Sequence, residues 1–416
     1  MCALNSPVMT APPPVLIVGD APDAGTGLGR ILGEMAEHAD AYLKDVCRIA
    51  TLGYGGPGSR RFKFMQYHIE GMNDWVIPNL PDAWEDWAGN EAGVILFIWD
   101  ASRLGWFSRP NVMCDDPDLK LFLTNAKIER WIYSPVDALG PRGNLTYPLV
   151  QALLGFDRIL AYGEFGEGII RQSLGEEFSQ ERDLTSIPHG INPEIFYPRN
   201  REASRKSFFS ITGAALMHSQ SKIVLDDEPL IGTVATNQKR KDWGLWAKSC
   251  FRFLERHPKA RFWIHTDTLE RDWSIPALII DFGLTDRTVI SLGFLTNDEM
   301  AQAYSACDLT LGIGAGEGFG YPIAESLFCG TPVIHGNYAG AVDFLQNESL
   351  INPTELHLEG AYSCERPTFN PKDWADRMDY LLGKDVNPPS QLDWNYVWPR
   401  FETWFRKGLA KLNSQP

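Results

Sequence analysis

The chain has 416 residues, of which 44% are hydrophobic and 22% are charged, and its formal net charge at pH 7 is −15. This length is enough for two domains of roughly 200 residues, and the composition is that of a folded globular protein rather than a disordered chain. The acidic balance argues against a surface built for nonspecific binding of polyanions, so a small molecule is the expected partner.

The cysteines and the apolar runs indicate the compartment. Seven cysteines, an odd number without a CxxC pair, predict free thiols in a reducing compartment rather than a disulfide framework or a zinc site. The N-terminus lacks the charged region and apolar core of a signal peptide, and the longest apolar runs, such as residues 94–99, are too short to span a bilayer. We therefore expect a cytoplasmic protein without a transmembrane segment.

The first half of the chain predicts a doubly wound α/β domain. A β-branched run at residues 15–18 leads through a glycine-rich turn into a helix at residues 27–38. Gly27 lies in the GTGLG part of this turn, where backbone N–H groups can approach a phosphate or an acceptor, and a plain tight turn is an equal alternative. Further strands are expected at 46–51, 93–99, 130–137 and 157–162, with a helix at 167–174.

Two polar residues follow the apolar run at 93–99. Asp100 comes directly after this run, and Arg103 lies three residues later. Doubly wound folds bind their ligands at the carboxyl ends of strands, so both residues are candidates for the acceptor side of a site. The alternative for Asp100 is an aspartate that caps the following turn.

The second half begins a second domain after a polar connection. Residues 199–228 are polar and irregular, which suits a segment between domains. A strand at 231–235 then leads into a basic turn with Arg240 and Lys241, and a helix follows. Cations at the start of a helix are unfavourable unless an anion binds there as well, so these two are candidate phosphate ligands. Solvated surface charges are the alternative.

Residues 309–336 contain the most distinctive pattern of the chain. An apolar run is followed by a loop with glycine at every second position from 312 to 320, a helix at 322–329 and a second apolar run. Such a unit places the free N–H groups of a helix N-terminus at the edge of a parallel sheet, where they favour an anion. Glu325 lies among apolar residues and therefore needs a partner, for which ligand hydroxyls are candidates. A glycine-rich turn with solvated Glu317 and Glu325 is the alternative.

The remaining expected elements complete the second domain and add a C-terminal helix. Strands are expected at 261–265 and 289–292, and helices at 275–282, at 297–306 after a capping box of Thr296 and Glu299, and within 336–345. Apolar residues at three- and four-residue spacing predict a last helix at 392–412, with Pro399 in its first turn.

The segment EGFGYPIAE, residues 317–325, resembles the E-x7-E signature of retaining glycosyltransferases of family 4, which have the GT-B fold. Residues 130–137, 185–198 and 237–241 are similar to further segments of that family, the last of them to its phosphate clamp. The resemblance implies an α/β protein with two doubly wound Rossmann-like domains, a cleft between them and a C-terminal helix that crosses back. The implied divisions are an acceptor-side domain at 1–200, a nucleotide-sugar-binding domain at 201–388 and the crossing helix at 389–416.

The resemblance also implies roles for individual residues. Glu325 would hold the ribose of a nucleotide-sugar, and Glu317 would contact the transferred sugar. The implied donor-binding residues are Gly27, Arg240, Lys241, Glu317, Gly318, Phe319, Gly320, Tyr321 and Glu325, and the implied catalytic residues are Glu317, Asp100 and Lys241. No metal is expected, and no cofactor besides the nucleotide-sugar co-substrate. Two positions depart from the family, because Thr236 stands where many members have arginine and no histidine lies near Asp100. We expect His189, in the segment 185–198, to be structural.

The function that this resemblance implies is transfer of a hexosyl or pentosyl group, with retention of anomeric configuration, to a glycan, a small molecule or a modified macromolecule. One alternative is a catalytically degenerate protein that only binds a nucleotide-sugar. Another is a phage-type transferase that modifies nucleic-acid bases, for which nucleic acid would be the acceptor. The E-x7-E pattern weighs against a third alternative, a sugar-nucleotide epimerase or a phosphorylase.

Overall fold

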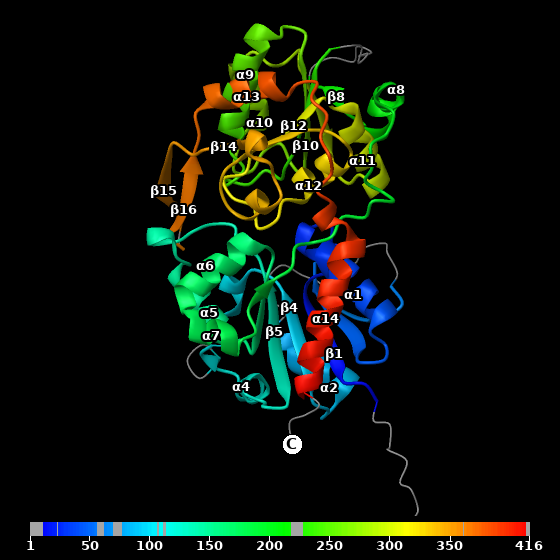
Figure 1. Cartoon of the computed structure of the whole chain (residues 1–416), viewed down its shortest axis with the longest axis vertical. Coiled ribbons are helices and arrows are strands. Elements are labelled where there is room, and N and C mark those ends of the chain that lie inside the picture. The colour runs from blue at the N-terminus through cyan, green and yellow to red at the C-terminus, as the bar shows by residue number, and fades with distance from the viewer. Residues whose placement is uncertain are drawn as a thin grey trace, which may run out of the picture.

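The computed structural model describes residues 11–22, 24–55, 62–69, 77–105, 108–110, 114–217, 228–360 and 362–412. Figure 1 shows two lobes stacked along the long axis, the lower one built from the N-terminal half of the chain and the upper one from the C-terminal half. Each lobe contains a seven-stranded sheet, in the orders β3-β2-β1-β4-β5-β6-β7 and β14-β13-β12-β9-β10-β11-β8. These are the two doubly wound units that the sequence predicted.

The sheet of the lower lobe is parallel throughout the described strands. Its central strands are apolar over almost their whole length because helices cover both faces of the sheet. The strand order reverses between β1 and β4, and the carboxyl ends of these two strands face the upper lobe. The strands are β1 Pro14–Asp20, β2 Arg48–Tyr54, β3 Met65–Ile69, β4 Gly93–Ile98, β5 Ile128–Ser134, β6 Arg158–Ala161 and β7 Thr185–Ser186.

The first helix of the lower lobe starts in the glycine-rich turn, as predicted. The side chain of Thr26 accepts a hydrogen bond from the Gly29 N–H at 2.9 Å and so caps α1. The helices of this lobe are α1 Gly27–Tyr42, α2 Leu80–Ala88, α4 Pro117–Leu123, α5 Tyr147–Leu153, α6 Glu164–Leu174 and α7 Glu176–Glu181.

The upper lobe repeats the architecture with one antiparallel edge strand, β8. The predicted capping box is present, since the Thr296 side chain and Glu299 cap each other's backbone N–H groups. The strands are β8 Ala215–Leu216, β9 Leu230–Val234, β10 Arg261–Thr266, β11 Thr288–Leu292, β12 Leu309–Gly312, β13 Val333–Gly336 and β14 Leu350–Ile351. The helices are α8 Arg201–Thr212, α9 Trp243–Arg256, α10 Ile275–Asp281, α11 Asn297–Ala306, α12 Tyr321–Phe328 and α13 Pro371–Leu381.

The prediction of an irregular connection at 199–228 is wrong in its first part, because residues 201–212 form α8. Asn200 caps this helix by accepting from the Ala203 N–H at 2.9 Å, and Phe208 is buried against Trp263 of the upper lobe. The polar residues that suggested a linker form the exposed face of an amphipathic helix. The segment 218–227 lies outside the described residues. Between 336 and 345 the expected helix is a short 3-10 turn, η4 Gly340–Asp343.

The last helix, α14 Trp394–Leu412, lies along the lower lobe, so the expectation of a C-terminal helix that crosses back is confirmed (Figure 1). The tryptophans of this helix pack into the core. The ring of Trp404 lies edge-on to that of Trp131, with 4.9 Å between ring centres, and the indole N–H of Trp394 donates to Glu34 of α1 at 3.2 Å. The placement of Pro399 in the first turn is wrong, because the helix starts five residues earlier. Burial of Trp394 and Trp398 ahead of the proline offsets the backbone hydrogen bond that it cannot donate.

A two-stranded hairpin extends from the upper lobe toward the lower one, and the sequence analysis did not anticipate it. Strands β15 Glu355–Glu359 and β16 Cys364–Thr368 pair in antiparallel fashion. The Glu365 N–H donates to the carbonyl of Leu139 in the lower lobe at 2.7 Å (Figure 1). The implied domain boundaries at 200 and 388 fall between the two sheets and before α14, and they stay predictions.

Candidate active site

The glycine-rich loop between β12 and α12 lies where the two lobes meet. Gly316 and Gly320 have φ values of 130° and 93°, which side chains other than glycine rarely adopt. A Cβ atom at Gly316 would clash with the Asp137 carbonyl of the lower lobe, and one at Gly318 would lie 2.6 Å from the Pro135 Cβ. Glycine at positions 316 and 318 therefore lets the loop pack directly on the lower lobe.

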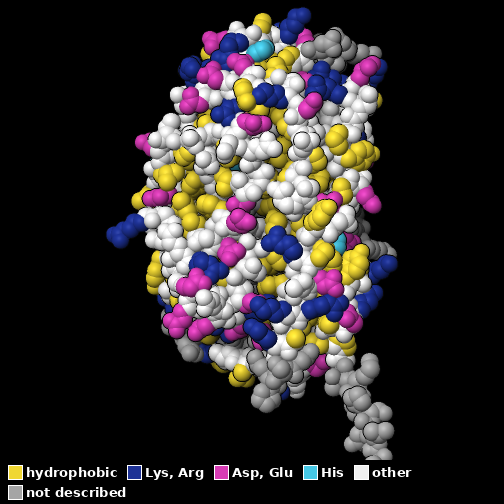
Figure 2. All heavy atoms as spheres, viewed as in Figure 1, with side chains coloured by type: hydrophobic (Ala, Val, Ile, Leu, Met, Phe, Trp, Pro, Cys, Tyr) yellow, Lys and Arg dark blue, Asp and Glu magenta, His cyan; other side chains and the backbone are white. Residues whose placement is uncertain are grey.

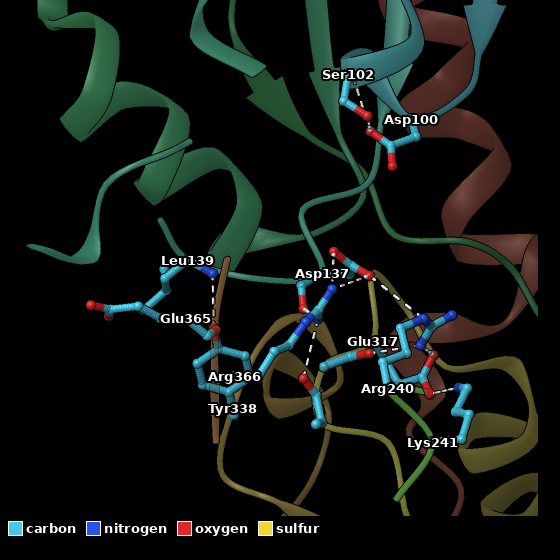
Figure 3. Close-up of polar contacts among 12 residues, drawn as sticks. Asp100, Ser102, Asp137, Leu139, Arg240, Lys241, Glu317, Tyr338, Glu365 and Arg366 are labelled. Atoms are coloured by element: carbon cyan, nitrogen blue, oxygen red, sulfur yellow. Dashed lines mark hydrogen bonds and ion pairs between the residues drawn. The ribbon is translucent and has the colours of Figure 1, made fainter. Parts of the chain in front are cut away.

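Two cations from the loop before α9 hold Glu317. Lys241 forms an ion pair with Oε1 of Glu317, and Arg240 Nη1 lies 3.3 Å from Oε2 (Figure 3). The same Arg240 nitrogen donates to the Gly316 carbonyl at 2.8 Å. The structure thus brings together three of the predicted donor-site residues, of which Glu317 lies more than 70 positions after the other two in the sequence.

Arg240 and Lys241, which we call the cationic group, are arranged so that they can bind an additional anion. Burial, and after it the positive charge of Arg240, hold the pKa of Lys241 well below its usual value, and the nearby Arg366 acts in the same direction. A negatively charged ligand beside these side chains would stabilise the ammonium form of Lys241. Because the N-cap residue of α12 is Gly320, which has no side chain to cap the helix, its N-terminus adds a positive dipole end on the same loop.

Asp137 and Arg366 complete this group, and the sequence analysis assigned neither to the site. Arg366, on β16, donates to the carbonyl of Asp137 at 2.8 Å and to that of Ala315 at 3.2 Å, and its Nη2 lies 3.3 Å from the Asp137 carboxylate. Arg240 Nε lies 3.7 Å from the same carboxylate. Figure 3 shows Asp137 between the two arginines. No motif marks Arg366, because its position depends on a hairpin that contacts the opposite lobe.

Glu325 has the partner that its burial requires, and the partner is part of the protein. Its carboxylate is 5% exposed, forms an ion pair with Arg30 of α1 and accepts from the Tyr304 hydroxyl at 3.1 Å. Arg30 also lies 2.9 Å from Glu34 and 4.2 Å from the ring centre of Tyr321. The need for a partner is confirmed, while the ribose contact stays a prediction.

The other predicted donor-site residues line the same junction. A Cβ at Gly27 would lie 3.7 Å from Tyr321 Cδ2, so the first glycine turn faces the start of α12. Phe319 and Tyr321 lie 4.6 and 5.3 Å from the His189 ring. His189 is buried, lies 2.8 Å from the Tyr133 hydroxyl and has its pKa lowered by burial, in accord with the structural role predicted for it.

Asp100 and Arg103 lie apart from this cationic group. Asp100 accepts from the N–H and the hydroxyl of Ser102 at 3.0 and 2.8 Å and caps the short turn η2 Ala101–Leu104, which is the capping alternative. Burial and the charge of Asp137 raise the pKa of Asp100. Arg103 is exposed, with its guanidinium 5.6 Å from the ring centre of Trp99. In Figure 3 Asp100 is separated from Glu317 and Lys241, so the predicted catalytic trio does not form one contact group.

Comparison with solved structures identifies the architecture. Sucrose-phosphate synthase from Thermosynechococcus elongatus superposes with a TM-score of 0.66 at 14% identity and covers 96% of this chain and 100% of its own. Anabaena HepE, solved in complex with UDP and glucose, gives a TM-score of 0.65 at 13% identity and covers 95% and 99%. The chain has the GT-B fold. The GT-B prediction made from the sequence is therefore confirmed.

Sequence comparison places a known domain in the upper lobe. Residues 228–384 match the family model described as glycosyl transferases group 1. D-inositol 3-phosphate glycosyltransferase of Mycobacteroides abscessus is 27% identical over 197 residues, which are 46% of this chain and 38% of that protein. Alpha-monoglucosyldiacylglycerol synthase of Acholeplasma laidlawii is 28% identical over 154 residues, 36% of this chain and 35% of that protein. The aligned part thus spans about a third of each relative.

Two absences among the described residues concern membranes and metal ions. None of the described helices is long and apolar enough to cross a bilayer. Within the same ranges, no three or more His, Cys, Asp or Glu side chains are grouped so that they could hold a metal ion. The six cysteines that the structure describes are free, as predicted, and Cys2 lies outside the described ranges.

Proposed function

We propose that this protein is a retaining glycosyltransferase that moves a sugar from a nucleotide-sugar to a hydroxyl-bearing acceptor. One observation carries the proposal: Arg240 and Lys241 meet Glu317 on the glycine loop before α12, at the junction of two GT-B lobes. The match of residues 228–384 to the group 1 glycosyltransferases and the GT-B neighbours support it.

The donor diphosphate would bind to the cationic group. Arg240 and Lys241 already compensate one carboxylate, and the uncapped N-terminus of α12 adds a partial positive charge. Both features become more stabilising as negative charge develops on the leaving diphosphate, which is what acceleration of the reaction requires. Glu317 lies beside these cations and would contact the transferred sugar.

In the proposed reaction the bond between the anomeric carbon and the diphosphate oxygen breaks, and the acceptor oxygen bonds to the same face of the sugar. The acceptor proton leaves with the diphosphate, so atoms and charge balance. Glu325 would accept from the ribose hydroxyls. Since Arg30 now occupies one of its oxygens, the ribose has to share that carboxylate or displace Arg30.

The first donor to test is UDP-glucose, because the neighbour HepE was solved with UDP-glucose. We expect it to raise the melting temperature in proportion to the logarithm of its concentration above the dissociation constant, and the purified protein to release UDP slowly. Lys241→Ala should abolish the shift. Lys239→Ala is the matched control, because Lys239 is exposed and pairs with Glu359 rather than Glu317. If no nucleotide-sugar in a panel of bases and sugars stabilises the protein, the proposal is wrong.

A nucleotide-sugar-binding protein without turnover is the second candidate. Thr236, at the place where the resemblance calls for arginine, is exposed. UDP release that Glu317→Gln abolishes while UDP-glucose binding persists would exclude this candidate. The base-modifying alternative has less support, because basic and acidic side chains are interspersed over both lobes on the face in Figure 2 rather than gathered into a basic surface.

A further inference from the structure

Four adjacent strands of the lower sheet end in polar side chains that face the upper lobe. Asp20 is the last residue of β1, Asp100 follows β4, Asp137 follows β5 and Tyr162 directly follows β6. Asp137 is engaged by Arg366 and Arg240. The other three have no cation from the upper lobe among their described contacts, and the proposed donor chemistry does not use them.

Tyr162 is the residue that indicates a ligand. Its side chain is 5% exposed, and its hydroxyl has no hydrogen-bond partner among the described residues. Buried hydroxyl groups in folded proteins are nearly always paired, and this one is free to pair with a ligand. The ring cannot turn away, because it is packed against Tyr133 at 4.4 Å and His189 at 4.2 Å.

Asp20 and Asp100, at the ends of the two central strands, lie near enough to Tyr162 for their charges to act on its hydroxyl. Burial raises the pKa of Tyr162 well above its usual value, and the charges that raise it further are those of Asp20 and Asp100. The phenol therefore keeps its proton and acts as a hydrogen-bond donor. The carboxylates beside it are acceptors, so the group offers both kinds of partner to a hydroxyl.

The two carboxylates are held in fixed orientations. Asp20 accepts from the Trp99 indole N–H at 3.0 Å and from the Thr26 hydroxyl at 2.7 Å. Asp100 is held by Ser102, and Figure 3 shows this contact on the turn that carries Asp100 and Ser102. Each carboxylate oxygen can accept more than one hydrogen bond, so these contacts leave acceptor capacity for a ligand.

At the junction, the upper and the lower lobe form two walls that carry charges of opposite sign. The upper lobe presents Arg240 and Lys241 to the junction, and the lower one presents Asp20 and Asp100. Asp100 is also acted on by the negative charge of Asp137, and Arg103 is the one cation among the causes that shift its pKa. An anionic acceptor would be repelled by the lower wall, whereas an uncharged polyol would not.

We propose that Asp20, Asp100 and Tyr162 form an acceptor subsite for an uncharged polyhydroxy compound, such as a sugar or a cyclitol, rather than a phosphorylated one. The inference rests on the proposed glycosyltransferase function. Gly318 of the upper lobe covers the Tyr162 ring, since a Cβ there would lie 3.7 Å from Tyr162 Cδ2, so the acceptor enters when the lobes separate.

The experiment compares matched pairs of acceptors: glucose with glucose 6-phosphate, and myo-inositol with myo-inositol 1-phosphate. The readout is UDP release from UDP-glucose, or from the donor that the thermal-shift panel selects, above the rate of hydrolysis without acceptor. We expect the uncharged member of a pair to stimulate release more than its phosphate. Preference for the phosphorylated members, or no stimulation by either uncharged compound, overturns the proposal.

Variants separate an acceptor contact from a structural role. Tyr162→Phe and Asp20→Asn should each raise the acceptor KM about tenfold, roughly the loss of one hydrogen bond, and raise the donor KM much less. Tyr162→Phe should leave the melting temperature unchanged or higher, because the hydroxyl has no protein partner to lose. Tyr147→Phe, at an exposed position of the same lobe, is the control. An unchanged acceptor KM in Tyr162→Phe overturns the proposal, whereas absence of any donor turnover contradicts the proposed function itself.

Discussion

The negative charge of Glu317 has two opposing effects in this site. Its carboxylate pairs with Lys241 and Arg240, so it compensates one buried and one partly exposed cation when no ligand is bound. The same negative charge competes with a donor diphosphate for those cations. Donor binding and sugar contact are therefore expected to respond differently when this charge is removed.

Under the proposed function, Glu317→Gln should lower the rate of transfer by about 100-fold or more, because it would remove the proposed contact to the sugar in the transition state. The dissociation constant of UDP should stay the same or fall by up to about tenfold, since the cations lose a competing carboxylate. Calorimetric titration with UDP and steady-state kinetics measure the two effects. Glu348→Gln, on the exposed surface, is the control. Loss of UDP binding in Glu317→Gln would contradict this account.

Arg30→Ala should lower the free energy of unfolding by about 3 kcal/mol, because it leaves the carboxylate of Glu325 buried with only the Tyr304 hydroxyl as a partner. Denaturation by urea measures the loss. Adding Glu325→Gln to Arg30→Ala should recover part of it, since the unpaired charge is then absent. If the losses of the two single variants simply add, the two side chains do not stabilise each other.

At the scale of elements, the hairpin β15–β16 and the glycine loop act as one contact between the lobes. Arg366 joins them, because it donates to a carbonyl of the loop and to Asp137 of the lower lobe. Tyr338 adds to the same contact by accepting from the Leu139 N–H at 2.8 Å and donating to the Glu365 carbonyl. The hairpin therefore positions the loop that carries Glu317 against the opposite lobe.

Arg366→Gln should loosen the junction, because the ion pair with Asp137 and a buried hydrogen bond are lost together. We expect a larger radius of gyration in small-angle X-ray scattering without donor, and weaker UDP binding. Arg377→Gln is the matched control, since Arg377 donates to carbonyls at 347, 348 and 350 within the upper lobe. Equal scattering by the two variants would show that Arg366 does not hold the lobes together.

At the scale of the whole molecule, the two lobes also meet at the start of α6. Asp343 of the upper lobe accepts from the Phe165 N–H at 3.1 Å, and so caps a lower-lobe helix that has no capping side chain of its own. Burial, with a contribution from Glu164, raises the pKa of Asp343 to about 6. A titratable group thus lies in the contact between the lobes.

The contribution of Asp343 to stability should depend on pH. Because its pKa is higher in the folded protein than in the unfolded chain, where it is about 4, the folded state binds the proton more tightly. This stabilisation is fully present below pH 4 and is lost as the pH rises through 6. The difference in melting temperature between wild type and Asp343→Asn should therefore change between pH 4 and pH 7. A constant difference over that range would contradict the assigned pKa.

Local patterns in the sequence determined the elements and the nature of the site. Apolar runs and glycine-rich turns specify strands and helix starts through interactions between near neighbours, which is why the two sheets, α12 and the Glu317 loop were predicted from sequence alone. The prediction of an irregular linker at residues 199–228 was wrong in its first part. A polar amphipathic helix such as α8 has the composition of a linker, and only its buried face distinguishes the two.

Only the tertiary structure decided which charged groups meet. Arg30 and Glu325 lie 295 positions apart, and Arg366 and Asp137 lie 229 apart. Such pairs depend on the order of strands within each sheet and on how the lobes pack, and neither leaves a periodic signal in the chain. The sequence by itself thus determined a GT-B scaffold with a glycine loop that carries Glu317 and a separate basic turn at Arg240 and Lys241. The pairing of Glu325 with Arg30 follows from contact between the lobes, whereas Glu317 meets Arg240 and Lys241 through the packing of loops within the upper lobe.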